Sequence, residues 1–328
     1  MPRAREGVTG LELCERPAQH YGGISAVNCS ACLKSRLIQS LLERKVAKIL
    51  IDSNQLRTDD LRTFLSESPK NLAVLADVVA MEAYKHQAIK TMAESMSVLK
   101  DFPRQVLVLK GGGKLKFMHG KLAGLQRRLI DDTQSEEFPK FLDALEKAVN
   151  GDPAYVSAVE RHAKFAREHF SKLQFGAEEM RQALTTFSEI FSPQERAAFR
   201  NESGYSDEMR DKIGNSILEL TAFMIGAAGM GKRLASLKEA ANMPIFRVAT
   251  AVYLHGVRLY ALGSLANRSA ANLRNDFVDM TLVGYATYFD GILSGDRNVR
   301  KMYEHTCFCL HGMFGAHVPA VDRLSAGQ

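Results

Sequence analysis

The stretch VAKILIDSN at residues 46–54 decides the fold, because a short β-favouring apolar run ends there in three polar residues. A run of this kind, closed by Asp52-Ser53-Asn54, predicts a buried strand that opens into a loop. Similar runs follow at 72–75 (LAVL) and 105–109 (QVLVL), and a further strand is expected at 291–294 (GILS). The chain therefore contains the elements of a small β-sheet.

The segments between these runs have the periodicity of helices. Thr58 can cap a helix that carries Leu61, Phe64 and Leu65 on one face and that Pro69-Lys70-Asn71 ends. A single long helix is expected from Asp77 to about Lys100. The resulting β-α-β-α-β order has crossovers long enough for parallel pairing, so the sequence predicts an α/β fold.

A long helical region separates the third strand from the last one. Its amphipathic segments are expected at 138–150, 155–170 and 177–191, and a helix at 275–289 precedes the last strand. We therefore expect a parallel sheet flanked by helices and interrupted by a large all-helical insertion. The expected divisions are an N-terminal extension with a helix at 1–45, the first part of the α/β domain at 46–113, the insertion at 114–271 and the last part at 272–328.

The composition is that of an ordinary globular protein. The chain has 328 residues, 46% of them hydrophobic, and a net charge of +6, which weakly favours an anionic partner such as nucleic acid. The first ten residues, MPRAREGVTG, lack the apolar core of a secretory signal, and no apolar run is long enough to span a bilayer. We expect a cytoplasmic protein that does not enter the membrane.

Acidic residues recur beside the predicted strands. Asp52 follows the first strand, Asp296 lies two residues past the last, and Glu82 is early in the helix after the second. Asp279 lies near the start of the helix before the last strand, and Asp276, three residues earlier, shares its face. Because the carboxyl ends of parallel strands meet at one edge of a sheet, these carboxylates are expected to converge there.

Carboxylates that converge without a basic neighbour repel one another and raise one another's pKa. A divalent cation removes that penalty, and oxygen ligands suit Mg²⁺ or Mn²⁺. Such a metal can polarise a phosphate and activate water, so the pattern predicts a phosphodiester-cleaving site. Either Asp276 or Asp279 could supply the metal ligand from their shared helix.

Three runs resemble the PIN nuclease domain: ILIDSNQ at 49–55, VVAMEAYK at 78–85 and DFVDMTLVGYATYFDGILSGD at 276–296. In that family a strand ends in an Asp, a helix carries a Glu, an Ala-rich helix carries an Asp, and a last strand ends in a hydroxyl-x-Asp motif. The resemblance covers 46–109 and 272–305, and the long helical region departs from compact family members. It implies four catalytic, metal-binding acids (Asp52, Glu82, Asp279, Asp296), with Asn54 as the polar partner and Ser294 as the hydroxyl residue.

The resemblance implies a Mg²⁺- or Mn²⁺-dependent single-strand nuclease, most often an endoribonuclease. The expected substrate is RNA, with single-stranded DNA as an alternative, and the helical region could serve a homodimer or a regulatory protein partner. The basic stretch after the third strand, with Lys110, Lys114 and Lys116, could contact the phosphate backbone or could be a solvated helix start. The alternative function is a catalytically inactive PIN-like module that binds RNA or protein.

Several weaker patterns favour structural interpretations. Asp52 and Asp276 could simply cap the helices that follow them, and Glu82 could be a solvated helix residue. Cys29 and Cys32 form a CxxC that could bind zinc with Cys14, but ordinary thiols are favoured. The GAAGMGK segment at 226–232 resembles a phosphate-binding loop, yet Arg233 stands where that loop needs a Ser or Thr, so helix packing explains it better.

Overall fold

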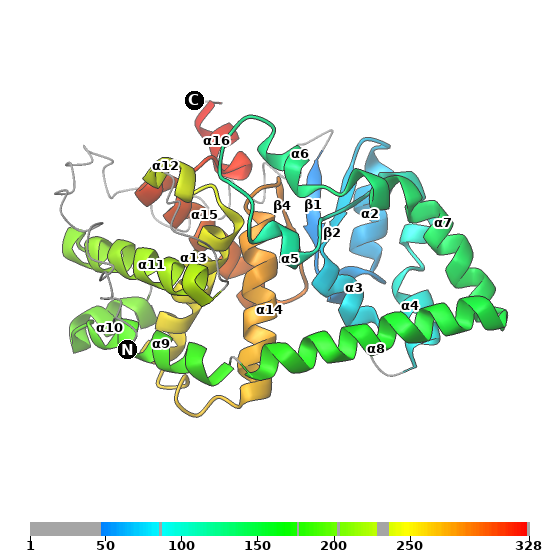
Figure 1. Cartoon of the computed structure of the whole chain (residues 1–328). Helices are drawn as coiled ribbons and strands as arrows, with labels where there is room; N and C mark the ends of the chain where they lie inside the picture. The colour runs from blue at the N-terminus through cyan, green and yellow to red at the C-terminus, as the bar shows by residue number, and fades with distance from the viewer. Residues whose placement is uncertain (1–46, 85–86, 176, 202–203, 228–235, 327–328) are drawn as a thin grey trace, which may run out of the picture.

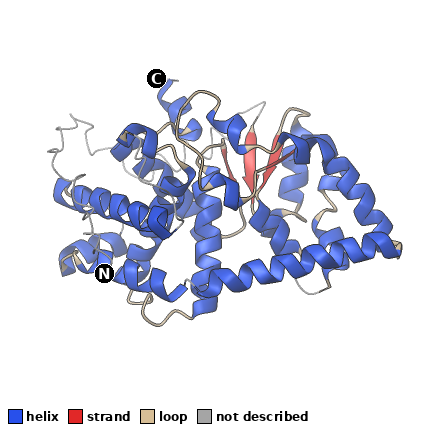
Figure 2. Cartoon of the chain, viewed as in Figure 1, coloured by secondary structure: helices blue, strands red, loops and turns tan. Residues whose placement is uncertain are grey.

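The computed structural model describes residues 47–84, 87–175, 177–201, 204–227 and 236–326. Within these residues four strands form one parallel sheet in the order β3-β2-β1-β4 (Figures 1 and 2). All four lie where the sequence predicts strands, so the α/β class and the parallel sheet flanked by helices are confirmed. Their bounds are β1 (Lys48–Ile51), β2 (Leu72–Leu75), β3 (Val106–Val108) and β4 (Gly291–Leu293).

The pairing of β1 with the edge strand β4 joins segments that lie far apart in the chain. Ile49, Leu50 and Ile51 of β1 lie beside Gly291, Ile292 and Leu293 of β4. Just before the strands, the backbone N–H of Lys48 donates to Asp290 Oδ2 at 2.8 Å, and the Asp290 N–H donates to the Lys48 carbonyl at 2.9 Å. The pairing continues past β1, where the Asp52 N–H donates to the Leu293 carbonyl at 2.9 Å.

The helix after β1 forms as predicted, whereas the helical stretch after β2 is divided into shorter elements. Thr58 caps α2 (Asp59–Glu67) as predicted, its Oγ1 accepting from the Leu61 N–H. The single helix expected from Asp77 to about Lys100 is wrong, because the chain forms α3 (Asp77–Ala83), α4 (Ala88–Ser95) and the 3-10 turns η2 (Leu99–Asp101) and η3 (Pro103–Gln105). Helix α3 packs on α8 and on η1 (Ser53–Gln55), whereas α4 packs on α7 and α8. The interruption lets each helix bury its apolar face against its own neighbours.

The described residues between β3 and β4 are almost entirely helical, and the four helices predicted within them are present. Figure 1 shows α8 running beneath the sheet side of the molecule, from α9 and α14 to α7. The division into two α/β parts around an insertion stays a prediction. The helices are α5 (Gly112–Leu115), α6 (Leu125–Leu129), α7 (Asp132–Val149), α8 (Pro153–Phe175), α9 (Ala177–Glu189), α10 (Pro193–Asn201), α11 (Asp207–Ala227), α12 (Leu237–Ala240), α13 (Pro244–Ala261) and α14 (Ala270–Ala286).

Helix α13 is the centre of this helical part. Its side chains are buried along nearly the whole length, and it packs on α14, α11, α15 and α9. A helix that is apolar on all sides needs such complete cover. Helix α14 in turn contacts β1 and β4, and α15 (Arg297–Phe314) also packs on β4 before α16 (Pro319–Ala326) ends the described chain.

A fully buried guanidinium reinforces this junction. Arg247 of α13 donates to the carbonyl oxygens of Thr287 at 2.9 Å and His317 at 2.6 Å, and to Asn242 Oδ1 at 2.7 Å. It also lies 3.8 Å from the centre of the Tyr288 ring. These contacts replace the lost hydration of a buried charge. They tie α13 to the segment that leads into β4.

Some sequence-based expectations fall beyond the described residues. The N-terminal extension and helix of 1–45, with the three cysteines considered for zinc, lie outside them, and so does most of the GAAGMGK segment. Among the helices that the structure describes, none combines the length and the apolar character needed to cross a membrane.

The β1–β4 pairing can be tested at Asp290. Asp290→Ala removes the buried acceptor of the Lys48 N–H, and we expect the free energy of unfolding, measured by urea denaturation, to fall by roughly 1–3 kcal/mol. Asp290→Asn keeps an acceptor oxygen and should lose less. Equal stability of Asp290→Ala and the unaltered protein would contradict this assignment.

Candidate metal centre

Asp52 lies directly after β1, at the carboxyl edge of the sheet. Its side chain is buried, and its Oδ2 accepts hydrogen bonds from Ser294 Oγ at 2.6 Å and Asn54 Nδ2 at 2.7 Å. Asn54 also joins the two strand ends, since its Oδ1 accepts from the Gly295 N–H at 2.9 Å. Asp52 makes no side-chain capping bond to η1, so its carboxylate is held by the neighbouring strand end instead.

Glu82 reaches the same edge from α3. Ser53 Oγ donates to Glu82 Oε2 at 2.6 Å and lies 3.5 Å from Asp52 Oδ1, so one hydroxyl stands between the two carboxylates. Burial raises the pKa of Asp52, the hydrogen bond from Ser294 partly offsets this, and the charge of Glu82 raises it further. Glu82 is therefore an electrostatic neighbour of Asp52 and not an isolated solvated residue.

Asp279 on α14 carries the strongest electrostatic signature in this region. Burial is the largest cause that raises its pKa, and together with the charges of Asp52, Glu82, Asp276 and Asp296 it brings the pKa to about 7. A carboxylate is affected in this way only where other negative charges lie close in a poorly solvated setting. The predicted acids are thus brought into one electrostatic cluster.

Asp296 has a structural task as well. It is the N-cap of α15, where Oδ1 accepts from the Asn298 N–H at 2.6 Å, and its own N–H donates to Ser294 Oγ at 3.1 Å. Ser294 thereby connects Asp296 to Asp52. The residue is exposed, so its second carboxylate oxygen borders solvent at the rim of the cluster.

Asp276 occupies a different environment from Asp279. Its carboxylate accepts from Arg268 Nη2 at 2.6 Å and from Arg268 Nε, and Oδ1 lies 3.6 Å from His255 Nε2. Burial raises its pKa, but the contacts with His255 and Arg268 outweigh that effect and lower it. Its charge is balanced by Arg268, which leaves Asp279 as the better candidate ligand on α14. Asp276 does not cap the helix, because Ser269 does.

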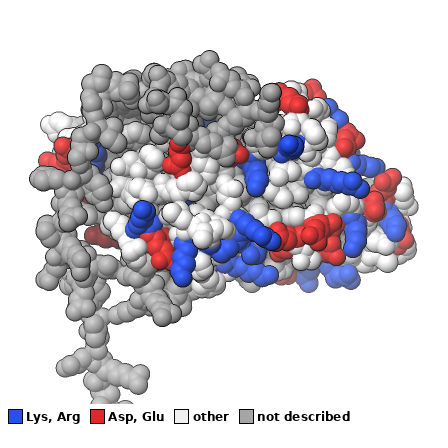
Figure 3. Space-filling model, turned by 90° about the horizontal axis from the view of Figure 1, so that it is seen from above, with Lys and Arg blue, Asp and Glu red and all other residues white. Residues whose placement is uncertain are grey.

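The three candidate lysines follow β3, two strand positions from β1 and so about 10 Å from it along the sheet. Lys110 Nζ donates to the Arg128 carbonyl at 2.7 Å, Lys114 lies in the last turn of α5, and Lys116 lies over the Phe117 ring. On the described part of the face in Figure 3, basic and acidic side chains are interspersed. Contact with an anionic polymer there would depend on individual side chains more than on a broad positive field.

Sequence reasoning missed two residues that organise the cluster. The sequence places Ser53 in the loop after the first strand, and its position beside Asp52 was the available signal for a hydroxyl that bridges Asp52 and Glu82. Arg300 donates to the Ser294 carbonyl at 2.5 Å and places a cation next to the rim. Its spacing of four residues from Asp296, on a predicted helix, was the available signal.

The fit of a cation to these residues is partial. Within the described ranges, no three or more acidic, His or Cys side chains are gathered closely enough to hold a metal ion. The cluster is nevertheless an oxygen-rich, negatively charged edge in which Asp279 gains from neutralisation. That donor set suits a hard cation such as Mg²⁺, which keeps several waters and needs only one or two direct carboxylates.

The raised pKa of Asp279 predicts a pH-dependent stability. The folded state binds the proton more tightly than the unfolded state, so this contribution is fully present below pH 3.8 and is lost as pH rises toward about 7. Asp279→Asn removes the titration. Its free energy of unfolding relative to the unaltered protein should therefore rise between these pH values, by up to about 1.4 kcal/mol per pH unit.

Urea denaturation at several pH values measures this difference. Asp59→Asn, in the exposed first turn of α2, is the control. Its free energy of unfolding should change with pH as that of the unaltered protein does over most of the pH range. A difference for Asp279→Asn that does not change with pH would show that its pKa is ordinary.

Comparison with known proteins adds no relative: no family model, no curated protein and no solved structure matches this chain.

Proposed function

We propose that the chain is a metal-dependent nuclease of PIN type, an endoribonuclease on single-stranded RNA, with its centre at Asp52, Glu82, Asp279 and Asp296. The observation that carries the proposal is the meeting of Asp52 and Glu82 at the Ser53 hydroxyl. Asp279 belongs to the same group of charges, because burial and the other acids raise its pKa to about 7. Acids held in mutual repulsion at the carboxyl edge of a parallel sheet are costly to stability. Such an arrangement is expected where a cation is to be bound.

The PIN-like assignment has two further supports. The strand order β3-β2-β1-β4 places the ends of β1 and β4 side by side, and the Ser294–Asp52 hydrogen bond joins the first acid to the hydroxyl residue of the last motif. Asn54 stands at the polar partner position and hydrogen-bonds to the same carboxylate. These contacts match the roles that the sequence resemblance implies.

In the proposed reaction the residues have distinct tasks. A bound Mg²⁺ or Mn²⁺ supplies Lewis acidity toward a phosphate and makes water more acidic. Asp52, oriented by Ser294 and Asn54, and Asp279 are the proposed direct ligands. Glu82 and Asp296 orient water at the rim, since each already has one oxygen committed to Ser53 or to the start of α15.

RNA is proposed to approach the carboxyl edge, with Arg300 beside the acids and Lys110, Lys114 and Lys116 beyond β3. Arg300 is the basic residue whose contact with the cluster is most direct, through the Ser294 carbonyl. The lysines would contact phosphates farther along the strand. Removal of their charges should weaken binding without changing the acids.

Two measurements on Asp52→Asn test the centre. Saturating Mn²⁺ should stabilise the unaltered protein thermally, by about 2.7 kcal/mol at a concentration 100 times the Kd, and should stabilise the variant much less. Cleavage of a fluorescent single-stranded RNA should fall at least about 100-fold in the variant. Asp59→Asn is the control and should keep both responses, because its side chain is exposed on α2. Full cleavage by a folded Asp52→Asn protein would overturn the proposal.

A second candidate is a catalytically inactive PIN-like module that binds RNA or protein. It is favoured by the spacing of the acids, because the described residues contain no ready-made group of three metal-ligating side chains. RNA binding without cleavage, together with no thermal response to Mn²⁺ or Mg²⁺, would select this candidate over the nuclease.

A further inference from the structure

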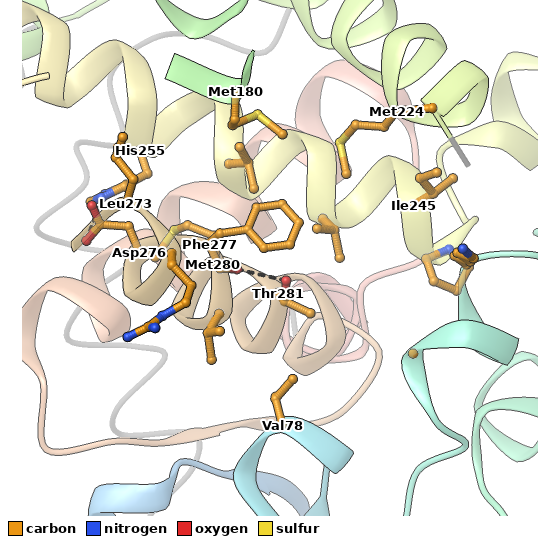
Figure 4. A pocket seen from close by; sticks show the side chains of 18 of the residues that line it. Val78, Met180, Met224, Ile245, His255, Leu273, Asp276, Phe277, Met280 and Thr281 are labelled. Carbon is orange, nitrogen blue, oxygen red and sulfur yellow. Dashed lines mark hydrogen bonds and ion pairs between the residues drawn. The ribbon is translucent and has the colours of Figure 1, made fainter. Parts of the chain in front are cut away.

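A cavity of about 630 Å³ lies on the helical side of the molecule, and none of the four proposed catalytic acids lines it. It is bounded by α9, α11, α13 and α14, and it reaches α3 and α5 at the α/β side. Figure 4 shows side chains from α14 and its neighbours pointing into this space. Its volume is in the range of small-molecule sites in proteins.

The body of the cavity is apolar and adaptable. Its walls include flexible and aromatic side chains, among them Met180, Met224, Ile245, Leu273, Phe277 and Met280 (Figure 4). Thioether side chains adjust to ligands of different shape. The lining therefore favours a hydrocarbon or aromatic ligand body.

One end of the cavity has a buried polar group that the protein does not satisfy. The side chain of His255 is 7% exposed, and neither of its ring nitrogens has a hydrogen-bond partner in the described structure. Its Nε2 lies 3.6 Å from Asp276 Oδ1, beyond hydrogen-bonding distance, and Asp276 is already bound by Arg268. The imidazole therefore has only a long ion-pair contact at Nε2 and no partner at Nδ1, and a ligand group at this end could supply the missing hydrogen bond.

We propose that this cavity binds an amphipathic small molecule, with an aliphatic or aromatic body among the methionines and an oxygen-bearing head group hydrogen-bonded to His255. A carboxyl or hydroxyl head fits, because the imidazole can donate to it or accept from it. The charges of Asp276 and Arg268 next to it balance each other.

This site does not depend on the proposed nuclease function. Successive residues on a helix are 100° apart, so Phe277 and Asp279 of α14 point about 200° apart around the axis. Phe277 lines the cavity, whereas Asp279 titrates with the acids at the sheet edge. The two sites share α14: none of the four proposed catalytic acids lines the cavity, and Asp276, at the polar end of the cavity, lies between the two sites.

Sodium decanoate below its micelle concentration is the probe, and isothermal titration calorimetry on the full chain is the measurement. We expect saturable binding at one site. Thr281→Trp, which fills the cavity from α14, should weaken binding at least about tenfold. His255→Phe keeps a ring but removes the hydrogen bond and should weaken it about tenfold, with a smaller loss in His255→Gln.

Ala93→Trp is the matched control, since Ala93 lines a separate hollow between α4 and α8 and its variant should bind like the unaltered protein. Val252→Phe fills the cavity from α13 and provides a second reading if Thr281→Trp does not fold. Absence of saturable binding would overturn the proposal. The proposal would also be overturned if folded His255→Phe and either cavity-filling variant bound decanoate with unchanged affinity.

Discussion

The parallel pairing of β1 with β4 is the constraint on which the rest of the structure depends. It joins residues 242 positions apart, and Asp290 and Lys48 exchange the hydrogen bonds that set its register. Closure of so long a loop costs conformational entropy, which the packing of α14 against the strands and of α13 against α14 must offset. With this register, Ser294 lies level with Asp52 and can hydrogen-bond to it. A shift of one residue would separate them.

Helix α14 connects the paired strands to the helical part of the molecule, because it contacts β1 and β4 as well as α13. One face packs on α13 so closely that a Cβ at Gly284 would lie 2.9 Å from the backbone of Val248, so the helix crossing depends on that glycine. The opposite face presents Asp279 to the other acids and keeps it partly desolvated. The apolar packing thus holds in place a carboxylate that is unfavourable by itself. This coupling is how a fold can maintain an electrostatically strained site.

The parts of the fold that sequence predicts well are those with local causes. The strands follow from short apolar runs with polar ends, and the α2 cap follows from Thr58 and its own helix. The break between α3 and α4 was missed because it results from packing on α7 and α8, which are distant in sequence. Asp276 and Asp279 look equivalent in sequence, yet Arg268 neutralises only the first. The role of His255 could not be predicted from the sequence either, because it depends on a cavity formed by several helices.

The sequence by itself determined the parallel α/β sheet, the helical character of the region between β3 and β4, and the acids that could belong to one site. Those properties depend on periodicity and on the position of polar residues relative to strands, which are local. The tertiary structure sets which acids interact through the Ser53 and Ser294 hydroxyls. It also places Arg268 against Asp276, whose charge the guanidinium neutralises. The cavity beside α14 was likewise decided by the tertiary structure. The physical reason is that charge interactions and burial depend on distances in space, and residues far apart in the chain set those distances.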